Sequence, residues 1–156
     1  MQVDLWENKL RIIKVVENKK DYLDLLLLGD EQESMIDRYL EAGELYALYD
    51  GNLKTVCVVK EIDCNTLEIK NLATYEEFQG RGYATKMLDY IFEYYREKFK
   101  KMIIGTGDAS LALSFYKKYG FQETYVVKNF FIDHYDHDII ENGCKLKDMQ
   151  YLEKEI

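Results

Sequence analysis

The sequence predicts an α/β fold in which helices pack on a mixed sheet. Three observations support this prediction. Strand-like and helix-like segments alternate in the order β-α-α-β-β-β-α-β-α-β-β, Asp50-Gly51 separates two strand-like runs, and one long segment carries an apolar stripe of helical period. Helices and sheets of this kind bury their apolar faces against each other in layers. No linker or repeat interrupts the 156 residues, so we predict a single domain over residues 1–156.

The first part of the chain is predicted to form a strand, two short helices and a hairpin. The expected positions are residues 10–16, 21–28, 34–42, 45–49 and 53–62. The two helices follow from apolar residues on one side of each segment, and a glycine comes directly after each of them. The hairpin follows from Asp50-Gly51, because both residues tolerate the positive φ of a tight turn.

The second part is predicted to form four strands and two helices. The expected positions are residues 66–72, 83–99, 102–105, 110–119, 121–127 and 146–152. In the long helix, apolar side chains recur at steps of three and four residues. Gly120 follows the shorter helix and is typical of a left-handed cap. We expect residues 129–143 to form an aromatic and acidic loop.

Composition narrows the classes of partner. The net charge is −8, which argues against nucleic-acid binding, because that function needs clustered Lys and Arg. The longest aliphatic run is residues 25–28, far short of a membrane span, and the first residues lack the apolar core of a signal peptide. Three cysteines without a C-x-x-C pattern favour a reducing compartment. We therefore expect a cytoplasmic protein, either a monomer or a homodimer.

A glycine turn precedes the long helix and could bind an anion. Residues 79–84 read Gln-Gly-Arg-Gly-Tyr-Ala. A helix start offers unpaired N–H groups and the positive end of the dipole, and glycines let a phosphate approach the backbone. The segment matches neither a Walker A loop nor a dinucleotide-binding fingerprint. On these residues alone, the alternative that the glycines only turn the chain stays open.

A second motif follows some thirty residues later. Residues 112–121 place Tyr116 near the end of a helix that Gly120 and Phe121 close. Together with residues 67–88, this pattern resembles the GNAT superfamily of acetyl-CoA-dependent N-acetyltransferases. The first stretch is similar to that family's strand, phosphate loop and helix, and the second to its tyrosine-bearing helix. This sequence departs from the family at Glu76, where proline is frequent, and at Ala84, where a final glycine is frequent.

The resemblance implies a GNAT fold, with a mixed, mostly antiparallel central sheet flanked by helices on both faces. It also implies acetyl-CoA as cofactor. Pantetheine would pair along the strand end, and the pyrophosphate would lie on the N–H groups of the turn and helix start. The cofactor-binding residues implied in this way are Leu72, Ala73, Thr74, Gln79, Gly80, Arg81, Gly82, Tyr83, Ala84 and Thr85.

Two catalytic residues are predicted from the same resemblance. An amine acceptor is protonated at neutral pH and must lose a proton before it attacks. Glu68, on the strand before the glycine turn, is the candidate base; the alternative is an exposed glutamate paired with a lysine. Tyr116 matches the family's proton donor to the leaving thiolate; the alternative is a core aromatic. No metal is expected, and His134 and His137 are assigned to a solvated or capping loop. The alternative for this loop is that His134 and Tyr135 shape the acceptor pocket.

The predicted reaction is transfer of an acetyl group from acetyl-CoA to a primary amine. The acidic chain favours a small cationic amine, similar to a polyamine or an aminoglycoside. Three alternatives stay open: a protein N-terminal or lysine acetyltransferase, a non-catalytic acetyl-CoA-binding module, and a plain interaction domain. The acceptor is the least determined part, because in this fold it depends on variable loops.

Overall fold

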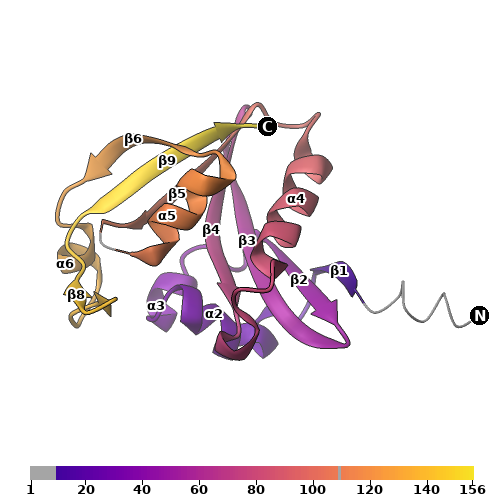
Figure 1. The fold of residues 1–156 in the computed structure, drawn as a ribbon, viewed down its shortest axis with the longest axis horizontal. Helices are drawn as coiled ribbons and strands as arrows, with labels where there is room; N and C mark the ends of the chain where they lie inside the picture. Colours follow the sequence, from indigo (N-terminus) through magenta and orange to yellow (C-terminus); the bar gives the residue numbers. More distant parts are fainter. Residues whose placement is uncertain (1–9, 109) are drawn as a thin grey trace, which may run out of the picture. The chain divides into compact units, whose positions relative to one another are not determined.

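The computed structural model describes residues 10–108 and 110–156, and its main feature is a mixed sheet. Seven strands are hydrogen-bonded in the order β1-β2-β3-β4-β5-β9-β6, and a separate hairpin joins β7 and β8. The pairs β1–β2, β2–β3, β5–β9 and β6–β9 are antiparallel, whereas β4 and β5 are parallel. The predicted mostly antiparallel sheet is therefore confirmed (Figure 1).

The chain divides into two compact units, and β4 contributes to both. Unit 1 holds residues up to Lys60 and Lys70–Arg96, and unit 2 holds Glu61–Ile69 and Glu97–Ile156. The prediction of one domain over residues 1–156 stays a prediction. Residues 1–9 and 109 lie outside the described part.

Unit 1 contains two hairpin-linked strands with helices on both of their faces. Its elements are β1 (Leu10–Val15), η1 (Lys19–Tyr22), α2 (Leu23–Gly29), α3 (Glu33–Ile36), β2 (Glu44–Asp50), most of β3 (Asn52–Asp63), the second part of β4 (Thr66–Thr74), η2 (Glu76–Phe78) and α4 (Tyr83–Tyr95). Gly51 joins β2 to β3 with φ of +79°, which confirms the predicted turn.

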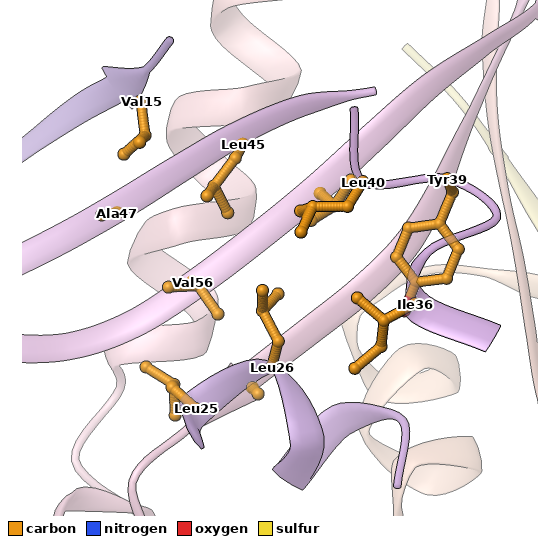
Figure 2. Close-up of a cluster of buried hydrophobic side chains, with 11 residues drawn as sticks. Val15, Leu25, Leu26, Ile36, Tyr39, Leu40, Leu45, Ala47 and Val56 are labelled. Carbon is orange, nitrogen blue, oxygen red and sulfur yellow. The ribbon is translucent and has the colours of Figure 1, made fainter. Parts of the chain in front are cut away.

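Buried side chains of β2 alternate between the two faces of the sheet, so unit 1 has a core on each face. Leu45 and Ala47 lie in a buried cluster with side chains of α2 and α3, as Figure 2 shows. Tyr46 is on the opposite face, where its hydroxyl lies 2.6 Å from that of Tyr95 in α4. Successive side chains of a strand point to opposite faces. Helices therefore cover both faces of these strands, as predicted.

Unit 2 contains the first part of β4 and the remaining strands. Its other elements are β5 (Lys101–Gly107), α5 (Leu111–Tyr119), β6 (Gln122–Val127), α6 (Phe130–His134), β7 (Ile140–Glu141), β8 (Cys144–Lys145) and β9 (Met149–Glu155). Thr66–Ile69 of β4 pair in register with Lys101–Ile104 of β5, and all of β5 pairs with β9.

Three predicted boundaries were wrong by three residues or more, and each has a structural cause. The helix predicted at 34–42 is helical only to Ile36, because the following carbonyl groups turn toward the Lys19 ammonium. The long helix ends at Tyr95 rather than at residue 99; beyond it, the N–H of Lys100 donates to the Asn65 carbonyl.

The third wrong boundary is at the C-terminal end. The predicted loop 129–143 contains α6 and β7, and the last strand begins at Met149 rather than at residue 146. The cause is a small core in which Phe131, Ile139 and Leu146 are buried together. Burial of Leu146 in this core holds it outside the last strand.

Candidate functional site

The glycine turn of unit 1 forms an open helix start. Gly80 and Gly82 have φ of +78° and +85°, and a Cβ built on either would meet no atom of residues 10–108 or 110–156 within 4 Å. Gly82 is the N-cap of α4, and no side chain of the described residues caps the helix. The N–H of Lys86 donates to the Gly82 carbonyl at 3.0 Å, so the N–H groups of residues 83–85 precede this first helical bond. This arrangement suits a phosphate group.

The predicted cofactor residues of unit 1 come together at this turn. Leu72, Ala73 and Thr74 form the end of β4, and the side-chain amide of Gln79 donates to the Thr74 carbonyl at 3.1 Å. This bond connects the end of the strand with the start of the turn. Two stretches that the sequence resemblance assigned to one cofactor are therefore neighbours.

Lys54, Phe78 and Asp50 lie near the predicted cofactor residues Arg81 and Tyr83, and the sequence analysis did not include them in the site. The ammonium of Lys54, on β3, lies 3.4 Å from the ring centroid of Phe78, and the guanidinium of Arg81 lies 5.6 Å from the same centroid. The Tyr83 hydroxyl donates to Asp50 at 2.6 Å, and this hydrogen bond raises the pKa of Tyr83. The bond joins the first residue of α4 to the β2–β3 hairpin. The sequence analysis assigned Asp50 only to the hairpin turn with Gly51.

Glu68 is a buried acid in unit 2. It lies opposite Ile103 in the β4–β5 ladder and only 6% of its surface is exposed. Its Oε2 accepts a hydrogen bond from the Tyr151 hydroxyl at 3.2 Å. Glutamate is seldom buried to this extent. The alternative of an exposed glutamate does not describe this residue.

Tyr116 is also buried in unit 2, near the end of α5. Its ring contacts Phe115 and Phe121 in edge-to-face geometry, with centroids 5.2 and 5.4 Å away. Its carbonyl accepts the N–H groups of Gly120 and Phe121, and Gly120 has φ of +122°. Gly120 thus closes the helix as predicted, and this cap and the two rings hold Tyr116 in a defined place.

The two histidines of the C-terminal segment make local contacts. His137 Nδ1 lies 2.6 Å from an Asp136 carboxylate oxygen, and His134 Nδ1 lies 3.0 Å from the Phe130 carbonyl oxygen. Within residues 10–108 and 110–156, no group of three or more His, Cys, Asp or Glu side chains is arranged to hold a metal ion.

Comparison with known proteins identifies the family. Residues 41–123 match the model of the acetyltransferase (GNAT) domain. The chain is also 40% identical over 149 residues to YvbK of Bacillus subtilis (strain 168), described as an uncharacterized N-acetyltransferase; the match covers 90% of this chain and 93% of that protein. The chain belongs to the GNAT family of acetyltransferases.

Two solved GNAT structures agree closely with this fold. A GNAT family acetyltransferase from Elizabethkingia anophelis with acetyl-CoA bound has a TM-score of 0.89 and 38% identity, covering 96% of this chain and 99% of that one. A Bacillus subtilis acetyltransferase in complex with CoA has a TM-score of 0.85 and 38% identity, covering 95% and 99%. The predicted GNAT fold and N-acetyltransferase class are confirmed. The predicted cofactor, acetyl-CoA, is confirmed by the acetyl-CoA and CoA bound in these two relatives.

Among the helices of residues 10–108 and 110–156, none combines the length and the apolar character that a transmembrane span requires.

Proposed function

We propose that this GNAT acetyltransferase transfers an acetyl group from acetyl-CoA to the primary amine of a small cationic molecule. The observation that carries the proposal is the environment of Glu68, on the strand that leads to the glycine turn. Its carboxylate is buried and accepts a hydrogen bond from Tyr151. A protonated amine needs a base before it can attack, and a carboxylate held in place within a protein serves this role. An acceptor that is already neutral would need no such group.

Unit 1 would bind the cofactor. Pantetheine would pair with the backbone of Leu72, Ala73 and Thr74, and the pyrophosphate would lie at the start of α4. The open space at Gly80 and Gly82 and the helix dipole support this assignment. The residues proposed for the pyrophosphate end are Gln79, Gly80, Arg81, Gly82, Tyr83, Ala84 and Thr85.

The proposed reaction is direct transfer without a covalent enzyme intermediate. Glu68 takes a proton from the ammonium group, directly or through a water molecule. The neutral amine attacks the acetyl carbonyl, so that a C–N bond forms and the C–S bond breaks. Tyr116 gives its proton to the leaving CoA thiolate. The nitrogen loses its second proton as the amide forms, and this proton restores the Tyr116 hydroxyl. Its burial and its fixed ring contacts support this role.

The charge of the chain supports a cationic acceptor in the cytoplasm. The net charge is −8 and the loop after α2 contains Asp30 and Glu31. The negative electrostatic potential of these charges raises the local concentration of cations. The cysteines are free thiols, which supports a reducing compartment.

A panel of acceptors tests the proposal. The purified protein is assayed for CoA release from acetyl-CoA with polyamines, an aminoglycoside, neutral amines of similar size, and peptides with a free N-terminus or lysine. We expect the highest kcat/KM with a small cationic amine. Faster turnover of the peptides would instead establish a protein acetyltransferase. Tight acetyl-CoA binding without turnover of any acceptor would favour the non-catalytic module.

A further inference from the structure

The contact between Glu68 and Tyr151 connects two strands that are not adjacent. Glu68 lies on β4 and Tyr151 on β9, and β5 lies between them in the sheet. The Tyr151 hydroxyl donates to Glu68 Oε2 at 3.2 Å. We propose that Tyr151 is a positioning residue, which fixes the Glu68 carboxylate in the orientation needed to accept a proton from the acceptor. This inference rests on the proposed role of Glu68 as base.

A glycine on the intervening strand makes this contact possible. Gly105 of β5 is the register partner of Tyr151. A Cβ built on Gly105 would lie 2.9 Å from Cζ of Tyr151 and 2.5 Å from the sulfur of Met149. The Tyr151 ring therefore occupies the space above Gly105 that a side chain would otherwise fill. A Cβ at this position would force the Met149 side chain and the Tyr151 ring to shift.

The Tyr151 ring is held from its other side by a stacked tyrosine. Tyr125 of β6 lies parallel to it, with ring centroids 4.7 Å apart and an interplanar angle of 7°. Burial, and after it the charge of Glu68, raises the pKa of Tyr151. The hydroxyl consequently stays protonated through the neutral range and can act as a hydrogen-bond donor. Donation from a fixed group restricts the carboxylate to few orientations.

The arrangement resembles the way enzymes orient a general base with a supporting side chain. In such cases the supporting group touches neither substrate nor cofactor, and its loss lowers kcat while binding persists. The charged neighbours of Tyr125 are Glu68, Glu153 and Lys101, and the last two pair with each other at 3.3 Å. Tyrosine-to-phenylalanine changes leave this ion pair in place.

The test compares Tyr151→Phe with Tyr125→Phe. Both variants lose one hydroxyl from the same stacked pair, and the hydroxyl that donates to Glu68 is that of Tyr151. For Tyr151→Phe we expect kcat to fall roughly tenfold with little change in KM. The acidic limb of the kcat/KM profile should move to higher pH, because a donated hydrogen bond favours the ionised carboxylate. Tyr125→Phe should retain the wild-type kcat and pH profile.

Glu68→Gln separates this inference from the proposed function. In the Glu68→Gln background, adding Tyr151→Phe should cause no further loss, because both changes act on one group. An undiminished loss in that background, or a change in KM alone, would overturn the inference. So would a wild-type profile for Tyr151→Phe beside an impaired Glu68→Gln. A wild-type profile for Glu68→Gln itself would instead refute the proposed base.

Gly105→Ala provides an independent probe. The added Cβ should displace the Tyr151 ring while both functional groups remain. We expect the same loss of kcat and the same shift of the acidic limb as for Tyr151→Phe, in a variant whose circular dichroism shows that it is folded. A folded Gly105→Ala variant with the wild-type pH profile would contradict the inference.

Discussion

Tyr116 is the residue on which the second half of the proposed proton transfer depends. Its ring is buried between Phe115 and Phe121. Replacement by phenylalanine removes one hydroxyl and retains these contacts. If Tyr116 protonates the thiolate, Tyr116→Phe should lower kcat by about 10²-fold with little effect on cofactor affinity. The measurement is steady-state CoA release combined with calorimetric titration of CoA.

Tyr119 provides a matched control in the same helix. Its ring lies 6.2 Å from that of Phe121, so Tyr119→Phe also removes a hydroxyl beside this aromatic group. We expect this variant to keep the wild-type kcat. Equal kcat values for both variants, with chemistry rate-limiting, would make Tyr116 a core aromatic only.

Single residues also show how far sequence can predict a site. Glu68 and Tyr116 could be proposed from sequence because the family resemblance assigns each a role at a fixed spacing from a motif. Tyr151 was not, because it is 83 residues from Glu68 and becomes its neighbour only through the strand order. Gly105 could have given a signal, but a glycine within a strand can equally mark a bulge or a sharp bend.

The proposed cofactor site depends mainly on one element, the start of α4. Gly82→Trp would place an indole in the space where the pyrophosphate is proposed to lie, and we expect it to abolish CoA binding. The positive φ of Gly82 makes any other residue strained by about 1–2 kcal/mol, so the variant should be less stable but folded. Calorimetric titration with CoA measures the effect.

Gly143 supplies the control for this strain. It has φ of +75°, and a Cβ built there also meets nothing within 4 Å. Gly143→Trp should have a similar cost in stability and should bind CoA normally. Normal CoA binding by a folded Gly82→Trp variant would refute the phosphate site.

The segment after α3 depends on a buried lysine. The Lys19 ammonium donates to the carbonyls of Leu40 and Gly43, at 3.0 and 2.8 Å, and more weakly to Glu41. Lys19→Met should lower the free energy of unfolding by about 2 kcal/mol, because hydrogen bonds from a charged group to buried acceptors are lost. Urea denaturation followed by circular dichroism gives this value.

The neighbouring residue Lys20 is the matched control. It carries the same charge but pairs with Glu33 and Asp37 in solvent. Lys20→Met should change the stability far less than Lys19→Met, because exposed ion pairs contribute little. Equal losses for the two variants would show that the three carbonyl contacts of Lys19 do not stabilise this segment.

Sequence patterns located most elements but not where several of them end. The Asp50-Gly51 hairpin and the Gly120 cap have strong local signals, and both were predicted correctly. The end of α3 was not, because Lys19 contacts the segment that follows it, from more than twenty residues away in the chain. Helix α6 was missed because its side chains pack with Ile139 and Leu146, which follow it in the chain.

For the whole molecule, the net charge of −8 should influence the choice of acceptor. Added salt screens attraction between the protein and a cation, and the Debye length falls from about 30 Å at 0.01 M to about 3 Å at 1 M. The ratio of kcat/KM for a cationic amine to that for a neutral amine of equal size should therefore fall several-fold as salt is raised across this range. The neutral amine serves as the internal control. A ratio independent of salt would show that contacts within the pocket, rather than the overall field, select the acceptor.

The three thiols affect how this enzyme can be studied. Cys57 is buried, which raises the pKa of its thiol, whereas Cys64 in the β3–β4 turn and Cys144 in β8 are exposed. Acetyl transfer releases the thiol of CoA, so a thiol-reactive dye would count Cys64 and Cys144 together with every turnover. Serine at both positions gives an enzyme without this background. Restoring either cysteine alone then provides one attachment point for a fluorophore, and Cys57 becomes a label site only when the chain unfolds.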